Sequence, residues 1–200
     1  MKRLVVGISG ASGAIYGVRF LELLRGVPDV EAHLIISDAG RRTIVEETDY
    51  SVEAVEALAP RRYRNRDIGA AVASGSFKTA GMVIVPCSMK TLAGIRTGYA
   101  DGLIARAADV TLKERRRLVL VPRETPLSEI HLDNMLTLAR MGAIVMPPMP
   151  AFYNHPASIG DIVDHLVTRI LDQFDIDTPD AKRWNGVPPH KAANLKAVNV

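Results

Sequence analysis

The chain has 200 residues, of which 48% are hydrophobic and 24% charged, a composition typical of a globular protein and not of a disordered one. Its single cysteine, Cys87, excludes an intramolecular disulfide and a cysteine-rich zinc site, and no apolar run approaches the roughly 20 residues that a membrane span needs. The net charge of +3 does not indicate nucleic-acid binding, because residues 182–200 hold four basic side chains and no acid while the rest is nearly balanced. A cytoplasmic protein is expected.

Short apolar runs rich in β-branched residues alternate with segments of helical periodicity. The runs predict buried strands at residues 4–9, 32–36, 82–86, 118–122 and 143–146. The periodic segments predict helices at residues 15–24, 41–47, 51–58, from 91 onward, 128–140 (apolar at Ile130, Leu132, Met135, Leu136 and Leu138) and 158–174 (with Ile159 among the inward-facing residues). Residues 60–66, with four arginines, predict a loop, and the charge run 114–117 predicts a solvated turn.

This alternation predicts an α/β fold, with a doubly wound, mostly parallel sheet between two helical layers, Rossmann-like or flavodoxin-like. We expect one domain over residues 1–181 and a basic C-terminal tail over 182–200. Ligands of such folds bind beyond the carboxyl ends of the strands, so the residues that follow each strand are the candidates for a site.

The first strand is followed by a glycine turn, residues 10–13, with Ser9 and Ser12 as hydroxyl donors. Glycines and the start of the next helix favour phosphate binding. The turn lacks the Gly-Lys-Ser/Thr of a P-loop and the spacing of GxGxxG. Asp38 lies at a position from which it could bind a ribose, so dinucleotide binding stays an alternative.

Three further segments carry polar groups after strands. Ser88, Lys90 and Thr91 suit an anion or a polar ring edge, whereas Cys87 beside them is better explained as a packed residue than as a nucleophile. Arg123 and Glu124 lie between two prolines, where they favour anion binding and proton transfer over a surface ion pair. Arg106 and Lys113 fall on one helical face. The proline-rich loop at 147–156 presents Tyr153 and His155.

In their order and spacing these segments resemble the UbiX family of flavin prenyltransferases, over Lys2 to about Trp184. The resemblance is carried by residues 10–14 with Tyr16 and Gly17, 47–49, 86–88, 106–110 with 112–116, 118–124, and 152–153. It implies a flavoprotein that joins the dimethylallyl group of dimethylallyl (mono)phosphate to N5 and C6 of reduced FMN, without a metal. The prenylated FMN would serve UbiD-type decarboxylases, one of them in ubiquinone synthesis, and the flavin would lie between the subunits of a homo-oligomer, usually a dodecamer.

The resemblance also implies roles for individual residues. FMN would be held by Gly10, Ala11, Ser12, Gly13, Ser37, Ser88, Met89, Lys90, Thr91 and Arg123. Dimethylallyl phosphate would be bound by Arg106, Lys113, Tyr153 and Arg169. Glu47, Glu124 and Lys113 would act at the reacting centre, with Glu124 or the released phosphate taking the proton from the flavin carbon. Trp184 would close the prenyl pocket.

Three alternatives remain from the residues. An FMN-dependent cysteine-type decarboxylase shares the fold, but such relatives have Pro-Ala-Met-Asn where this chain reads Pro-Ala-Phe-Tyr-Asn at 150–154. A non-catalytic flavin-binding protein needs the glycine turn but not the charged residues named above. An NAD-dependent dehydrogenase fits least, because the glycine spacing is wrong.

Overall fold

The computed structural model describes residues 1–178 and 183, and its centre is a six-stranded sheet in which every recorded strand pairing is parallel. The strands are β1 (Lys2–Ile8), β2 (Val30–Ile36), β3 (Arg61–Arg64), β4 (Gly81–Cys87), β5 (Arg117–Pro122) and β6 (Ile144–Val145). Their order, β3-β2-β1-β4-β5-β6, is that of the Rossmann fold. Strands β1 to β3 extend the sheet in one direction and β4 to β6 in the other, so the topological switch point lies between β1 and β4. The predicted fold class is confirmed.

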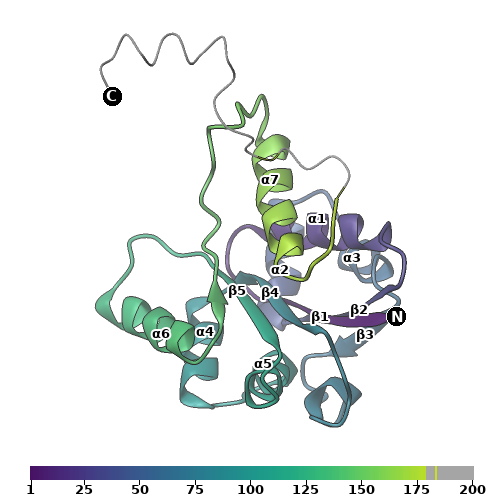
Figure 1. Cartoon of the computed structure of the whole chain (residues 1–200), viewed down its shortest axis with the longest axis vertical. Helices are drawn as coiled ribbons and strands as arrows, with labels where there is room; N and C mark the ends of the chain where they lie inside the picture. The colour runs from purple at the N-terminus through teal and green to yellow at the C-terminus, as the bar shows by residue number, and fades with distance from the viewer. Residues whose placement is uncertain (179–182, 184–200) are drawn as a thin grey trace.

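Helices cover both faces of the sheet, as Figure 1 shows. They are α1 (Ala14–Arg25), α2 (Asp38–Glu47), α3 (Val52–Ala57), α4 (Met89–Thr97), α5 (Leu103–Lys113), α6 (Glu129–Arg140) and α7 (Ile159–Asp172), with a short 3-10 helix at Ala71–Ala73. Successive strand residues point to opposite faces of the sheet and so pack into two cores. Leu4, Val6 and Ile8 pack with α1, α2, α3 and α7, whereas Val5 packs with α4, α5 and α6.

One prediction about a charged segment is wrong, and another is confirmed only in part. Residues 61–64 form the edge strand β3, paired with β2 from His33↔Arg61 to Ile36↔Arg64, because exposed arginines are compatible with an edge strand and discourage further pairing. Within the run 114–117, residues 114 and 115 form an exposed turn as predicted, but the Arg116 side chain is only 16% exposed, and Arg117 begins β5.

One apolar residue predicted to face inward is exposed in the single chain: Ile159, at the start of α7, is 81% exposed. Ile130, one of the apolar positions of α6, is 71% exposed. None of the helices in the described part of the chain is both long and apolar enough to cross a membrane. Trp184 and nearly all of the predicted tail, 182–200, lie outside the described residues, so their roles stay predictions.

Candidate functional site

The glycine turn joins β1 to α1 and is closed by a carboxylate. Gly13 precedes α1 with a φ of 101°, a left-handed conformation that glycine adopts without strain. The backbone N–H groups of Gly13 and Ala14 donate to Glu47 Oε2 at 2.7 and 3.1 Å. The N–H groups at a helix N-terminus have no partner within the helix, and together with the helix dipole they attract anions. Here the anion is the carboxylate of Glu47, the last residue of α2.

The environment of Glu47 keeps its carboxyl group ionised. Partial burial would by itself raise the pKa of Glu47, but the hydrogen bonds from Ser12, Gly13 and Ala14 and the charge of Arg123 together lower it below the usual value. Glu47 is therefore an acceptor at neutral pH, and Arg123 is close enough to act on it electrostatically.

The turns after β1 and β4 are tied together by Ser9. Its buried hydroxyl donates to the Pro86 carbonyl at 3.0 Å and accepts the Ser88 backbone N–H at 2.7 Å. Ser88 then caps α4 by accepting the N–H of Thr91. The sequence suggested Ser9 as a ligand donor; in the structure its hydroxyl links the turns that follow β1 and β4.

The remaining residues predicted for FMN lie at the same carboxyl edge of the sheet. Ser37 caps α2 by accepting the N–H of Gly40 at 2.9 Å. Met89 and Lys90 are in the first turn of α4, where Lys90 Nζ lies 3.4 Å from Asp101 Oδ2.

Arg123 and Glu124 follow β5, and the Arg123 backbone N–H donates to the Cys87 carbonyl at 3.3 Å. Glu124 accepts the backbone N–H of Thr125 at 3.1 Å, and the next helix is capped by Ser128 with His131. Because α6 has its own cap and no ion pair between Arg123 and Glu124 is recorded, the helix-capping explanation of this pair is wrong. Both residues follow the carboxyl end of β5 and are exposed in the single chain.

Cys87 is fully buried, and desolvation raises the pKa of its thiol to about 12. A thiol of that pKa yields almost no thiolate at neutral pH. Cys87 is therefore a packed core residue, as the sequence favoured.

Arg106 and Lys113 do not join the glycine turn within one chain. The helix that carries them, α5, starts beside the end of β3, where Leu103 N donates to Asn65 O, and ends beside residues 75–77, which lead into β4. Lys113 therefore stands at the amino edge of the sheet, about 10 Å along the helix axis from Arg106. Arg106 pairs with Asp109 at 2.8 Å.

Tyr153 and Arg169 both interact with His165, a residue that the sequence did not indicate. The Tyr153 hydroxyl lies 3.2 Å from His165 Nε2, and the two rings pack edge to face. Burial and the nearby charge of Arg169 lower the pKa of His165, partly offset by Asp172. The imidazole is therefore neutral at neutral pH and shares a hydrogen bond with the Tyr153 hydroxyl, a contact that nothing in the sequence around His165 signals.

Residues at the carboxyl edge form a donor set that fits a phosphorylated flavin. Two of the helices that begin there, α2 and α4, are capped by the hydroxyls of Ser37 and Ser88, and Arg123 adds a cation for a phosphate or a ring carbonyl. The third, α1, already directs its first N–H groups at Glu47. FMN has both an anionic phosphate and a ring edge with hydrogen-bonding groups. These residues would hold it, whereas the cations on α5 and α7 would act on a second ligand.

Comparison with known proteins agrees with this geometry. The model of the Flavoprotein family matches residues 1–171. A probable UbiX-like flavin prenyltransferase of Streptomyces sp. (strain D7) is 66% identical over 191 residues, which cover 96% of each chain. The chain therefore belongs to the Flavoprotein family, and within it to the UbiX-like flavin prenyltransferases.

Two solved structures are similar over nearly the whole chain. A dodecameric FMN-dependent UbiX-like decarboxylase from Escherichia coli O157:H7 has a TM-score of 0.91 at 59% identity, covering 92% of this chain and 100% of that one. AnUbiX (PadA1), in complex with FMN and dimethylallyl pyrophosphate, has a TM-score of 0.91 at 55% identity, covering 94% and 99%. The predicted family is confirmed, which decides against the dehydrogenase and the non-catalytic carrier.

Proposed function

We propose that this chain joins the dimethylallyl group of dimethylallyl phosphate to N5 and C6 of reduced FMN. The observation that carries the proposal is the donor set at the carboxyl edge, with Glu47, Arg123 and Glu124 around it. It is supported by the 55% identical AnUbiX, which was solved with FMN and dimethylallyl pyrophosphate. Reduced flavin supplies an electron-rich ring as the nucleophile, and the protein supplies orientation, charge and proton transfer.

The first task of the protein is to stabilise the leaving phosphate. Breaking an allylic C–O bond places negative charge on the phosphate oxygens, and preorganised cations and hydroxyl donors lower the barrier. Arg106, Lys113, Tyr153 and Arg169 are our candidates for this role. Since these donors are arginine, lysine and tyrosine side chains, the proposed reaction needs no metal to neutralise the phosphate.

The second task is to move a proton. The flavin carbon that closes the new ring must lose its proton, and we assign that proton to the carboxylate of Glu124. Glu47, which accepts the N–H groups of Gly13 and Ala14, stays ionised beside the glycine turn, and we assign it to the reacting centre.

The site is shared between copies of the chain. In one chain Lys113 stands at the amino edge of the sheet, remote from the glycine turn. A complete site therefore needs Lys113 from a neighbouring copy. A homododecamer with FMN at its interfaces meets this requirement, and the 59% identical relative from E. coli O157:H7 is dodecameric. We further propose that the enzyme is cytoplasmic, binds no nucleic acid and passes prenylated FMN to a UbiD-type decarboxylase.

Mass spectrometry of the flavin tests the proposal. The purified protein is incubated anaerobically with reduced FMN and either dimethylallyl monophosphate or diphosphate. We expect a flavin that gains one five-carbon unit, and the two donors show which phosphate is used. FMN of unchanged mass with both donors would contradict the proposed reaction, and a parallel incubation without donor controls for adventitious adducts.

A further inference from the structure

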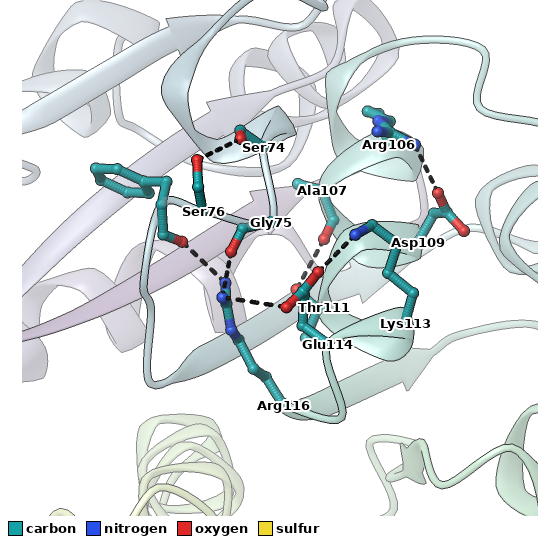
Figure 2. A network of polar contacts seen from close by, with 11 residues as sticks. Ser74, Gly75, Ser76, Arg106, Ala107, Asp109, Thr111, Lys113, Glu114 and Arg116 are labelled. Atoms are coloured by element: carbon teal, nitrogen blue, oxygen red, sulfur yellow. Dashed lines mark hydrogen bonds and ion pairs between the residues drawn. The ribbon is translucent and has the colours of Figure 1, made fainter.

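The end of α5 gathers three charged side chains over the turn formed by residues 74–77, as Figure 2 shows. Lys113 is the last residue of α5 and Glu114 caps it. Arg115 has a φ of 55°, and the Arg116 backbone N–H donates to the Thr111 carbonyl at 2.9 Å. This reversal turns Arg116 back toward the same turn that Lys113 and Glu114 face.

Hydrogen bonds to backbone carbonyl groups hold the Arg116 side chain in this cluster. Its guanidinium donates to the Gly75 carbonyl at 2.6 Å and to the Phe77 carbonyl at 2.8 Å, and its side chain is only 16% exposed. A planar guanidinium that makes two directed hydrogen bonds has little freedom to move. Its Nη2 lies 3.9 Å from Glu114 Oε2, so a stationary cation faces one oxygen of that carboxylate.

The other oxygen of Glu114 holds Lys113. Lys113 Nζ donates to Glu114 Oε1 at 2.5 Å. This hydrogen bond, followed by the positive charges of Lys113 and Arg116, lowers the pKa of Glu114 against a small opposing effect of burial. The carboxylate is therefore ionised at neutral pH and bridges the Arg116 guanidinium and the Lys113 ammonium.

Gly75 leaves the space that this bridge occupies. A Cβ atom added at Gly75 would clash with Glu114 Oε1 and lie 2.9 Å from Lys113 Nζ. The backbone of Gly75 has no positive φ, so an alanine would strain no dihedral angle there. An added methyl group would therefore meet the ends of the Lys113 and Glu114 side chains, and this pair would have to move to make room for it.

We infer that Glu114 is a positioning residue for Lys113, held in place by Arg116 and given room by Gly75. The inference rests on the proposed function, in which Lys113 binds the leaving phosphate. A lysine ammonium is a point charge on a flexible four-carbon stem, and stabilising a transition state requires the charge in place before the bond breaks. Glu114 does not contact the phosphate in this scheme; it restricts where the ammonium can be.

A double-mutant cycle tests the inference on the full-length assembled enzyme. Lys113→Met should lower kcat/KM for dimethylallyl phosphate by about 100-fold, and Glu114→Gln, which keeps the shape but removes the charge, by about 10-fold. Because Glu114 acts through Lys113, the double variant should be no worse than Lys113→Met alone. Effects that multiply in the double variant would overturn the positioning role and leave the proposed function intact. A Lys113→Met enzyme of unchanged kcat/KM would instead refute the proposed role of Lys113, and the inference with it.

Gly75→Ala provides a test that keeps every charge. The added methyl group displaces the Lys113–Glu114 pair, so kcat/KM for dimethylallyl phosphate should fall by about 10-fold while the Kd for FMN is unchanged. Glu53→Gln, which removes an exposed carboxylate on α3, is the matched control for Glu114→Gln and should retain wild-type kinetics. Gly75→Ala with wild-type kcat/KM, in a protein of normal thermal stability and assembly mass, would contradict the inference.

Discussion

The carboxylate of Glu47 accepts the backbone N–H of Gly13 at 2.7 Å, although 34 residues separate the two in the sequence. The contact joins the end of α2 to the start of α1, so one side chain both closes the glycine turn and places a negative charge at a helix N-terminus. The turn that would receive a phosphorylated flavin is therefore preorganised by a residue that we also assign to the reacting centre.

Glu47→Gln should weaken this closure. The amide oxygen still accepts a hydrogen bond, but the loss of charge should lower the free energy of unfolding by about 1 kcal/mol at pH 7. Since the folded-state pKa of Glu47 is lowered, its contribution is present above the unfolded-state pKa and disappears as the pH falls through the folded-state value. Urea denaturation from pH 7 to pH 3 should show the two proteins converge in acid. Glu46→Gln, at an exposed neighbouring carboxylate, is the control, and a difference that is independent of pH would contradict the explanation.

Glu124→Gln tests proton transfer. The variant keeps the shape of the side chain and should bind FMN with wild-type affinity, because Arg123 and the three helix starts are untouched. Without a carboxylate to take the proton, formation of prenylated FMN should slow by 100-fold or more, of the order typical for losing a general base. Flavin mass spectrometry over time measures this rate. Glu129→Gln, at an exposed position in the first turn of α6, should behave as wild type, and an unaltered rate for Glu124→Gln would remove Glu124 from the mechanism.

The sequence was informative where local pattern and topology act together. Buried strands and their helices could be recognised from apolar periodicity, and parallel strands place their following residues at one edge, which brought Ser12, Ser88 and Arg123 into one candidate site. The contacts of Glu47 could not be deduced from spacing, because they depend on how α2 packs beside α1. They entered the prediction only through the family resemblance.

One wrong prediction and one relationship that the sequence does not reveal have physical origins. The strand at Arg61–Arg64 has no alternation of apolar and polar residues, since an edge strand needs little burial, so its composition is that of a loop. Arg106 and Lys113 lie on one face of α5 as predicted, but the helical pattern does not reveal which edge of the sheet each approaches. That depends on the direction in which α5 crosses the sheet.

Cys87→Ala should leave catalysis intact. The thiol is buried and its pKa is raised to about 12 by desolvation, so it provides no nucleophile. Its removal deletes packing and a weak hydrogen bond from Sγ to the Ser88 carbonyl at 3.7 Å. We expect wild-type kcat and a loss of about 1 kcal/mol in the free energy of unfolding from the small cavity. Prenylation kinetics and urea denaturation measure the two effects. A loss of activity greater than tenfold at full FMN occupancy would show that the thiol takes part in the reaction.

Exposed apolar residues on α6 predict where copies of the chain meet. Ile130, Leu132 and Leu136 are 71%, 53% and 51% exposed in the single chain, and apolar exposure of this extent on one helix is typical of an interaction surface. Ile130→Asp would bury an unpaired charge in such an interface, so we expect the assembly to dissociate into smaller species.

Light scattering coupled to size-exclusion chromatography measures the mass, and flavin mass spectrometry measures the reaction. Because the proposed site draws Lys113 from a neighbouring copy, the dissociated Ile130→Asp protein should lose prenylation while its circular dichroism stays that of a folded α/β protein. Ala54→Asp adds the same charge at an exposed position on α3, on the other face of the sheet, and should change neither property. Full activity in a monomeric Ile130→Asp protein would mean that one chain contains the complete site.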